Sequence, residues 1–198
     1  MNPLTQFKKI PILPLLIALA LVAWAAGAAR AAISDFNGDG HQDYVLSNAS
    51  TRQTAIWYLS NNVFVGGAYG PTLPAGWALV AIADFNGDGH PDYVLGNTGQ
   101  TVGQTAIWYL SGPTLIRGAY GPTLPSGWYL VAIADFNGDG HPDYVLEAAS
   151  TRQTACWYLN NNVFVHGAYG PALPAPAAWT LFEVIVGLGP ATGKWDYP

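Results

Sequence analysis

The chain has 198 residues, of which only seven are basic and twelve acidic, so its formal net charge is −5. With so few Lys and Arg residues it has no basic stripe to neutralise phosphates, which argues against nucleic acid as a partner. Its single cysteine, Cys156, rules out a disulfide within the chain. A secreted domain without disulfides needs another source of rigidity, and a bound metal can supply it.

The first 31 residues have the pattern of a secretory signal peptide. Lys8 and Lys9 precede an apolar run from Ile10 to Ala29, and small residues for cleavage follow, up to Ala31. Prolines interrupt the start of the run, so its clean part, Leu15 to Ala29, is short for a membrane span. We expect a secreted protein, extracellular or on the cell surface, with no membrane span after cleavage. The periplasm is an alternative location. An uncleaved anchor is the alternative.

The next feature is a nine-residue motif, Asp-Phe-Asn-Gly-Asp-Gly-His-Xaa-Asp, at residues 35–43, 84–92 and 135–143. The copies start 49 and 51 residues apart, a period that indicates a repeat architecture. Without residues 1–31 the chain has four basic and twelve acidic residues, a net charge of −8, and nine of those acids lie in the motifs. Acidic residues that served only solubility would be distributed over the whole surface, so their clustering in the motifs indicates a binding site.

In each motif the first, third, fifth and ninth residues carry side-chain oxygens, and the seventh offers a backbone carbonyl. Glycine at the sixth position permits the sharp turn that brings these donors together. This spacing wraps a hard cation such as Ca²⁺ in six or seven oxygens, and three carboxylates so close together would repel one another without a cation. The expected calcium ligands, with each His contributing its carbonyl, are Asp35, Asn37, Asp39, His41, Asp43, Asp84, Asn86, Asp88, His90, Asp92, Asp135, Asn137, Asp139, His141 and Asp143.

The motif is distinct from an EF-hand, and it leaves two alternatives to a calcium site. An EF-hand needs a bidentate Glu at position 12, where this chain has Leu46, Leu95 or Leu146; the aspartate at position 9 is expected to take that closing role. Hairpin turns of the Asn-Gly or Asp-Gly type with solvated acids are the alternative to a metal site. The histidines suggest a transition metal, but their side chains should point away from a site that uses their carbonyls. Oxygen ligands suit Ca²⁺ or Mg²⁺ better.

The segment Trp128–Leu146, Trp-Tyr-Leu-Val-Ala-Ile-Ala-Asp-Phe-Asn-Gly-Asp-Gly-His-Pro-Asp-Tyr-Val-Leu, resembles an FG-GAP/VCBS repeat. Such repeats build the β-propeller of integrin α-subunits and many secreted bacterial proteins. The resemblance covers Ile33 to about Val186 and rests on the Asp-rich loop, while Gly-Ala-Tyr-Gly-Pro echoes the family's second signature only loosely. It implies calcium in each loop and blade-like sheets. It implies no particular ligand, because the partners of the family vary widely.

Each repeat is predicted to form four short antiparallel strands. The clearest examples are Trp77–Phe85, Tyr44–Asn48, Thr54–Ser60 and Val63–Tyr69, which are rich in Val, Ile, Tyr and Trp and bounded by Gly, Asn and Pro. No segment has a helical apolar period of useful length. The predicted fold class is therefore all-β, with propeller-like blades of four antiparallel strands. The predicted domains are a signal peptide (1–31), three repeats within 32–186 (about 35–83, 84–134 and 135–186) and a C-terminal tail (187–198).

Three blades are fewer than the ~4–8 of a closed propeller. The opening strand of the first blade would lie at Ala31–Phe36, mostly within the leader, and Trp179–Val186 aligns with the later copies of that strand. The C-terminal strand would then complete the first blade, so that both ends of the chain contribute strands to it. The alternatives are an open array, a truncated larger propeller, or a homo-oligomer in which two chains form a six-bladed ring. Bare apolar blade faces are rare, which favours self-association.

The expected function is binding or adhesion, with structural calcium and without catalysis; the protein or glycan ligand and its binding residues are unknown. A calcium-dependent lectin is the second hypothesis. The repeated tryptophans are interpreted as part of the core between blades rather than as a platform on which sugars stack. Tyr69, Tyr120 and Tyr169 are expected to be exposed, and they are the better candidates for contact with a ligand. A hydrolase is third. Its only visible dyad is Cys156 and His166, ten residues apart across a predicted turn at Asn161, and no catalytic residue is assigned.

Overall fold

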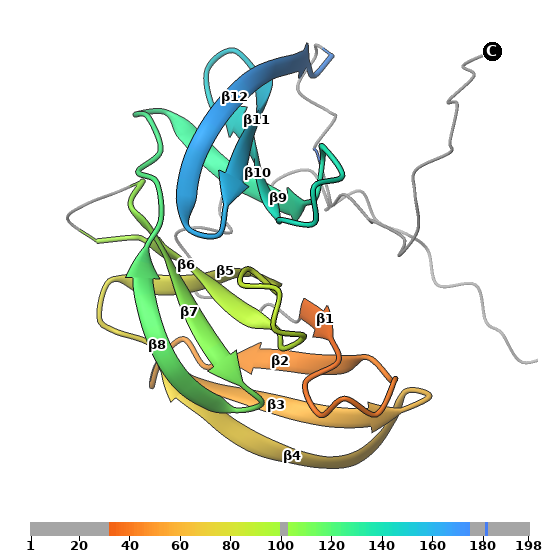
Figure 1. Cartoon of the computed structure of the whole chain (residues 1–198). Helices are drawn as coiled ribbons and strands as arrows, with labels where there is room; N and C mark the ends of the chain where they lie inside the picture. The colour runs from red at the N-terminus through yellow and green to blue at the C-terminus, as the bar shows by residue number, and fades with distance from the viewer. Residues whose placement is uncertain (1–31, 100–102, 175–180, 182–198) are drawn as a thin grey trace, which may run out of the picture.

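The computed structural model describes residues 32–99, 103–174 and 181. The predicted signal peptide, the tail and all of Trp179–Val186 except Leu181 lie outside the described residues. In the described part the protein is all-β, and Figure 1 shows three separate sheets. None of the described residues belongs to a helix that could span a membrane.

Each sheet is an antiparallel meander of four strands that follow one another in the chain. The predicted four-stranded blades are thereby confirmed, and the sheets do not close into a barrel. The first sheet contains β1 (Ala32–Ser34), β2 (Asp43–Ser47), β3 (Gln53–Ser60) and β4 (Val63–Thr72). The second contains β5 (Trp77–Ala83), β6 (Asp92–Asn97), β7 (Thr105–Ser111) and β8 (Thr114–Tyr120). The third contains β9 (Trp128–Ala134), β10 (Asp143–Ala148), β11 (Gln153–Asn160) and β12 (Val163–Ala172).

The outer strand of the first sheet is longer than predicted. β4 continues through Gly70 and Pro71, which the sequence pattern assigns to a turn. The Gln53 side chain of β3 accounts for the extension, because its Nε2 donates to the carbonyl of Gly70 (2.6 Å) and its Oε1 accepts from Thr72 Oγ1 (2.9 Å). Thr54 Oγ1 also donates to the carbonyl of Pro71 (2.8 Å). In the second sheet Thr105 makes the same bond to Pro122, but β8 ends at Tyr120.

The second sheet lies between the other two (Figure 1) and is the most buried. We call the side of a sheet that faces the next sheet in the chain its forward face, and the opposite side its rear face. Val45 and Ile56, on the forward face of the first sheet, pack with Leu95 and Ala106 on the rear face of the second. A second core joins the forward face of the second sheet to the rear face of the third and includes Val94, Ile107, Leu146 and Ala155.

Candidate metal loops and aromatic clefts

The acidic motifs form the loops that join the first and second strands of each sheet. In the first loop, Asp35 Oδ1 accepts hydrogen bonds from the amides of Gly38 (2.7 Å) and Asp39 (3.2 Å), and Oδ2 accepts one from Gly40 (2.8 Å). Gly38 and Gly40 have φ of +74° and +84°, a left-handed conformation that suits glycine and turns these amides inward. Asp84 and Asp135 accept the same three bonds.

The third, fifth and seventh residues of the loop are also linked to one another. Asn37 Oδ1 accepts from the amide of Asp39 (3.0 Å), and Asn37 Nδ2 donates to Asp39 Oδ2 (2.9 Å). The amide of His41 donates to Asp39 Oδ1 (2.8 Å). The bond from the His41 amide, followed by that from Asn37, holds the pKa of the exposed Asp39 carboxyl below its usual value. This carboxylate is therefore charged and open to solvent.

The ninth residue has a role that the sequence pattern did not reveal. Asp43, Asp92 and Asp143 are completely buried. Asp92 Oδ2 accepts from the amide of Phe85 (3.0 Å) within its loop, while Oδ1 accepts from the amide of Leu110 (3.0 Å) on β7. Equivalent pairs of bonds hold Asp43 and Asp143. The ninth aspartate thus ties the loop to the third strand of its sheet, and its part in closing a metal site stays a prediction.

Burial and neighbouring charges disfavour the ionised form of this buried carboxyl. Burial raises the pKa of Asp92 to about 6, although hydrogen bonds from the Leu110 and Phe85 amides lower it, and the nearby Asp88 and Asp84 carboxylates raise it further. The pKa of Asp143 is raised for the same reason, burial first. A cation beside these carboxylates would relieve both the repulsion and the loss of hydration.

The donors in each loop are oxygens from carboxylates and an amide, and such a set suits a hard cation. Across the described residues, no three His, Cys, Asp or Glu side chains gather in a ready-made metal cluster. The loops differ from such a cluster in that their acids are tied to backbone amides and that an Asn and a carbonyl would complete the set. The residues fit a calcium ion by chemistry, and the fifteen predicted ligands remain predictions.

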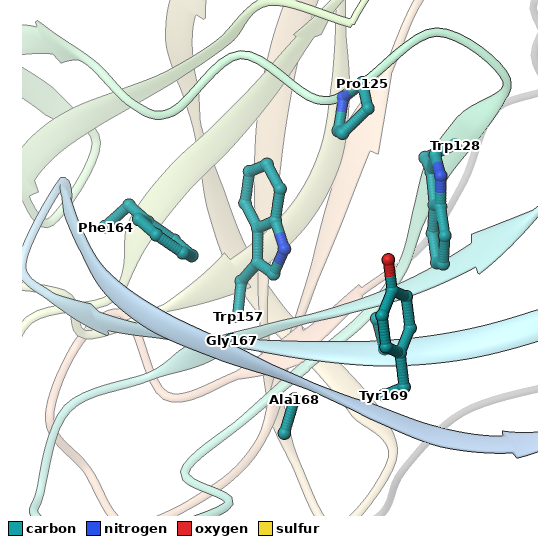
Figure 2. Close-up of a pocket in the computed structure, with 8 residues that line it drawn as sticks. Pro125, Trp128, Trp157, Phe164, Gly167, Ala168 and Tyr169 are labelled. Atoms are coloured by element: carbon teal, nitrogen blue, oxygen red, sulfur yellow. The ribbon is translucent and has the colours of Figure 1, made fainter.

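A second repeated feature is a cleft lined by aromatic side chains. In the third sheet a cleft of about 330 Å³ is lined by Pro125, Trp128, Trp157 and Tyr169, among others (Figure 2). The rings of Trp128 and Tyr169 lie tilted, 6.0 Å apart. The second sheet has the equivalent cleft, about 420 Å³ in volume, lined by Pro74, Trp77, Trp108 and Tyr120.

The tryptophans that line the clefts are neither fully buried in the core nor fully exposed to a ligand. Trp77 and Trp108 pack against the core between the first two sheets while they line the cleft. A Cβ on Gly118 would lie 2.8 Å from Trp108 Cδ1, so the glycine lets the indole rest on strand β8. The interpretation of these residues as core therefore holds for only part of each ring. Tyr69, Tyr120 and Tyr169 are exposed, as predicted.

Two sets of repeated residues have roles that sequence reasoning missed. One is the glycine beneath the tryptophan, at Gly67, Gly118 and Gly167. The other is the threonine that follows each Gln at the start of the third strand. Tyr93 Oη donates to Thr54 Oγ1 (3.4 Å), and Tyr144 Oη to Thr105 Oγ1 (3.2 Å), across the two interfaces between sheets. Their recurrence at one place in every repeat is the signal that could have found them.

The proposed Cys156–His166 pairing is wrong. Asn160 pairs with Val163, so the turn is Asn161-Asn162, and a β-bulge between Tyr158 and Leu159 shifts the register by one more residue. Cys156 therefore pairs with Ala168, and His166 pairs with Tyr158. The His166 ring stacks on Tyr158, with centroids 4.4 Å apart. Burial raises the pKa of the Cys156 thiol to about 12, the opposite of what an activated nucleophile needs.

Comparison with known proteins agrees with the repeat pattern. The profile of a family described as FG-GAP-like repeat matches residues 35–95 and, in a second copy, residues 84–146. The two matches together span more than half of the chain. No curated protein matches it.

Proposed function

The chain belongs to the FG-GAP-like repeat family, and we propose that it is a secreted, calcium-stabilised binding or adhesion module. The observation that carries the calcium proposal is the identical hydrogen-bonded loop in all three sheets, with its exposed Asp at position 5 and buried Asp at position 9. The repeat family and the all-β blades support a binding role, because such modules present surfaces more often than they perform chemistry.

Calcium would have a structural role in this protein. Each loop joins the first two strands of a sheet, and its ninth aspartate is tied to the third strand. An ion in the loop would neutralise carboxylates that otherwise repel one another, and would hold three strands together. Extracellular calcium modules typically bind with Kd ~10⁻⁴–10⁻³ M. At a ~100-fold excess of calcium over Kd, one site adds ~2.7 kcal/mol of stability.

Calcium titration of single-loop variants tests this proposal. Asp88→Ala removes an exposed carboxylate from the second loop, and we expect it to remove one of three calcium equivalents. The matched control is Thr98→Ala, an exposed residue outside the loops in the same sheet, which should keep all three. Secretion has a separate test: the mature protein should begin at Ala32 when its N-terminus is determined by mass spectrometry.

A lectin is the second candidate, favoured by the two equivalent aromatic clefts. Tryptophan and tyrosine rings offer large apolar surfaces with a polar edge. A glycan array probed in calcium and in chelator would distinguish a lectin from a protein-binding adhesin. We propose no catalysis, because the Cys156 thiol is poorly ionised and the register separates it from His166.

A further inference from the structure

The two interfaces between sheets are built from the same repeated contacts. Between the first and second sheets, Phe36 packs edge-on against Tyr93, with centroids 6.2 Å apart, and the Tyr93 hydroxyl reaches Thr54. Between the second and third sheets, Phe85 and Tyr144 repeat the ring contact at 6.2 Å, and Tyr144 reaches Thr105. In each case the forward face supplies the phenylalanine and the threonine, and the rear face supplies the tyrosine.

The forward face of the third sheet has the equivalent phenylalanine and threonine, with Cys156 in place of an isoleucine, but no sheet lies against it in the described structure. Phe136 is 47% exposed, whereas its equivalents Phe36 and Phe85 are 3% and 0% exposed. Tyr158 is only partly buried, like Tyr58 on the first sheet, whereas Tyr109 on the middle sheet is 2% exposed. Cys156, in the place of the fully buried Ile56 and Ile107, is also only partly buried.

The rear face of the first sheet is the matching half. Tyr44, Leu46 and Ala55 are all partly exposed there, although their equivalents in the second and third sheets are buried. Leu95 and Leu146, for example, are 1% and 0% exposed. Trp57 adds an aromatic ring that is 45% exposed. Leu46, Ala55 and Trp57 line an open hollow on this side of the sheet.

We propose that a second copy of this chain docks on these two faces, head to tail. The forward face of the third sheet of one copy would cover the rear face of the first sheet of the other, reproducing the contacts already made twice within each chain. Phe136 and Thr154 would then receive Tyr44 of the other copy. This contact would continue the two existing interfaces, because apart from Cys156, which replaces an isoleucine, it uses only residue types already found between the protein's own sheets.

A contact of this kind is heterologous, so it forms a ring if the rotation closes and an open chain if it does not. Two copies contribute six blades, within the ~4–8 of closed propellers. Both end faces of both copies would then be covered at once. The proposal concerns assembly and is separate from calcium binding, so either can fail without the other.

Two charge insertions test the two faces separately. Ala55→Glu places a carboxylate on the rear face of the first sheet, and Tyr158→Glu places one on the forward face of the third. Both sites are partly exposed within a single chain, so the variants should fold. The control is Ile116→Glu, which charges a side chain that is 61% exposed on β8 of the middle sheet, outside the proposed contact.

The full chain and each variant are measured by analytical ultracentrifugation in saturating calcium, with circular dichroism to verify folding. We expect two chains per particle for the unmodified protein and for Ile116→Glu, and one chain for each face variant. An equimolar mixture of Ala55→Glu and Tyr158→Glu retains one intact pair of faces and should form a 1:1 complex.

Other results would overturn the proposal in identifiable ways. A single chain at every concentration would mean that the end faces are covered from within the chain or stay bare. A dimer lost only in Ala55→Glu would indicate a symmetric contact between two first sheets. A ladder of three or more chains would keep the head-to-tail contact but refute the closed ring.

Discussion

The buried aspartate and the exposed aspartate of one loop should affect stability in different ways, and the second loop allows a direct comparison. Asp92 is fully buried and accepts hydrogen bonds from the amides of Phe85 and Leu110, whose side chains are also buried. Asp88 is exposed, and its hydrogen bonds lie within the loop. We compare Asp92→Ala, Asp92→Asn and Asp88→Ala.

The magnitudes follow from the number of amides left unpaired. A buried amide without a partner costs ~1–3 kcal/mol. Asp92→Ala leaves two such amides, so it should lower the free energy of unfolding by ~2–6 kcal/mol. Removal of the disfavoured buried charge offsets part of this loss. Asp92→Asn removes the same charge but keeps one acceptor oxygen. The free energies of unfolding of the Ala and Asn variants should therefore differ by ~1–3 kcal/mol, the cost of leaving one amide unpaired. In chelator, Asp88→Ala should lie within ~0.5 kcal/mol of the unmodified protein.

The free energy of unfolding is measured by urea denaturation at pH 7, in chelator and in calcium at ~100-fold excess over Kd. Calcium should stabilise the unmodified protein more than Asp88→Ala by ~2.7 kcal/mol, the contribution of one site. Asp92→Ala should be destabilised in both conditions. The reasoning is refuted if Asp88→Ala loses as much stability in chelator as in calcium, or if Asp92→Ala matches Asp88→Ala in chelator.

Three further predictions concern packing, reactivity and pH. Gly118→Ala should cost ~1–3 kcal/mol of stability, because the new methyl group displaces Trp108; Gly66→Ala, whose Cβ would meet nothing closer than 3.8 Å, is the matched control and should be near neutral. Iodoacetamide at pH 8 should alkylate Cys156 roughly 10²-fold more slowly in the folded protein than in urea, because its pKa is raised to about 12; equal rates would contradict the burial. In chelator, stability should rise as the pH falls from 7 towards 4, because the folded-state pKa of Asp92 is about 6 and its unfolded value ~3.9. This contribution is fully present below pH ~4 and lost as the pH rises through 6; a fall in stability over the same window would contradict it.

Much of the fold follows from the sequence because the repeat displays each strand three times. Runs rich in Val, Ile, Tyr and Trp, bounded by Gly, Asn and Pro, locate the strands, and the observed bounds of β3 and β5 differ from the predicted ones by one and two residues. The predicted β4 is too short, because the hydrogen bond from Gln53 to the carbonyl of Gly70 is a long-range contact that a local pattern does not contain.

The candidate site was predictable in composition but not in its connections. The loop residues were identified by spacing alone, whereas the burial of the ninth aspartate depends on the Leu110 amide, eighteen positions away. The Cys156–His166 hypothesis failed for two reasons: the turn is centred between Asn161 and Asn162, which alone would pair Cys156 with Gly167, and the bulge moves the partner one residue further, to Ala168. Symmetry about a turn does not reveal such a bulge.

The number of calcium ions bound by the purified protein tests whether the three acidic loops are metal sites. Equilibrium dialysis over 10 µM to 10 mM calcium, a window around the ~10⁻⁴–10⁻³ M affinities of such modules, should give three ions per chain, one for each loop. If the protein binds no calcium at any concentration in this range, the loops are not calcium sites, and they are hydrogen-bonded turns without a metal.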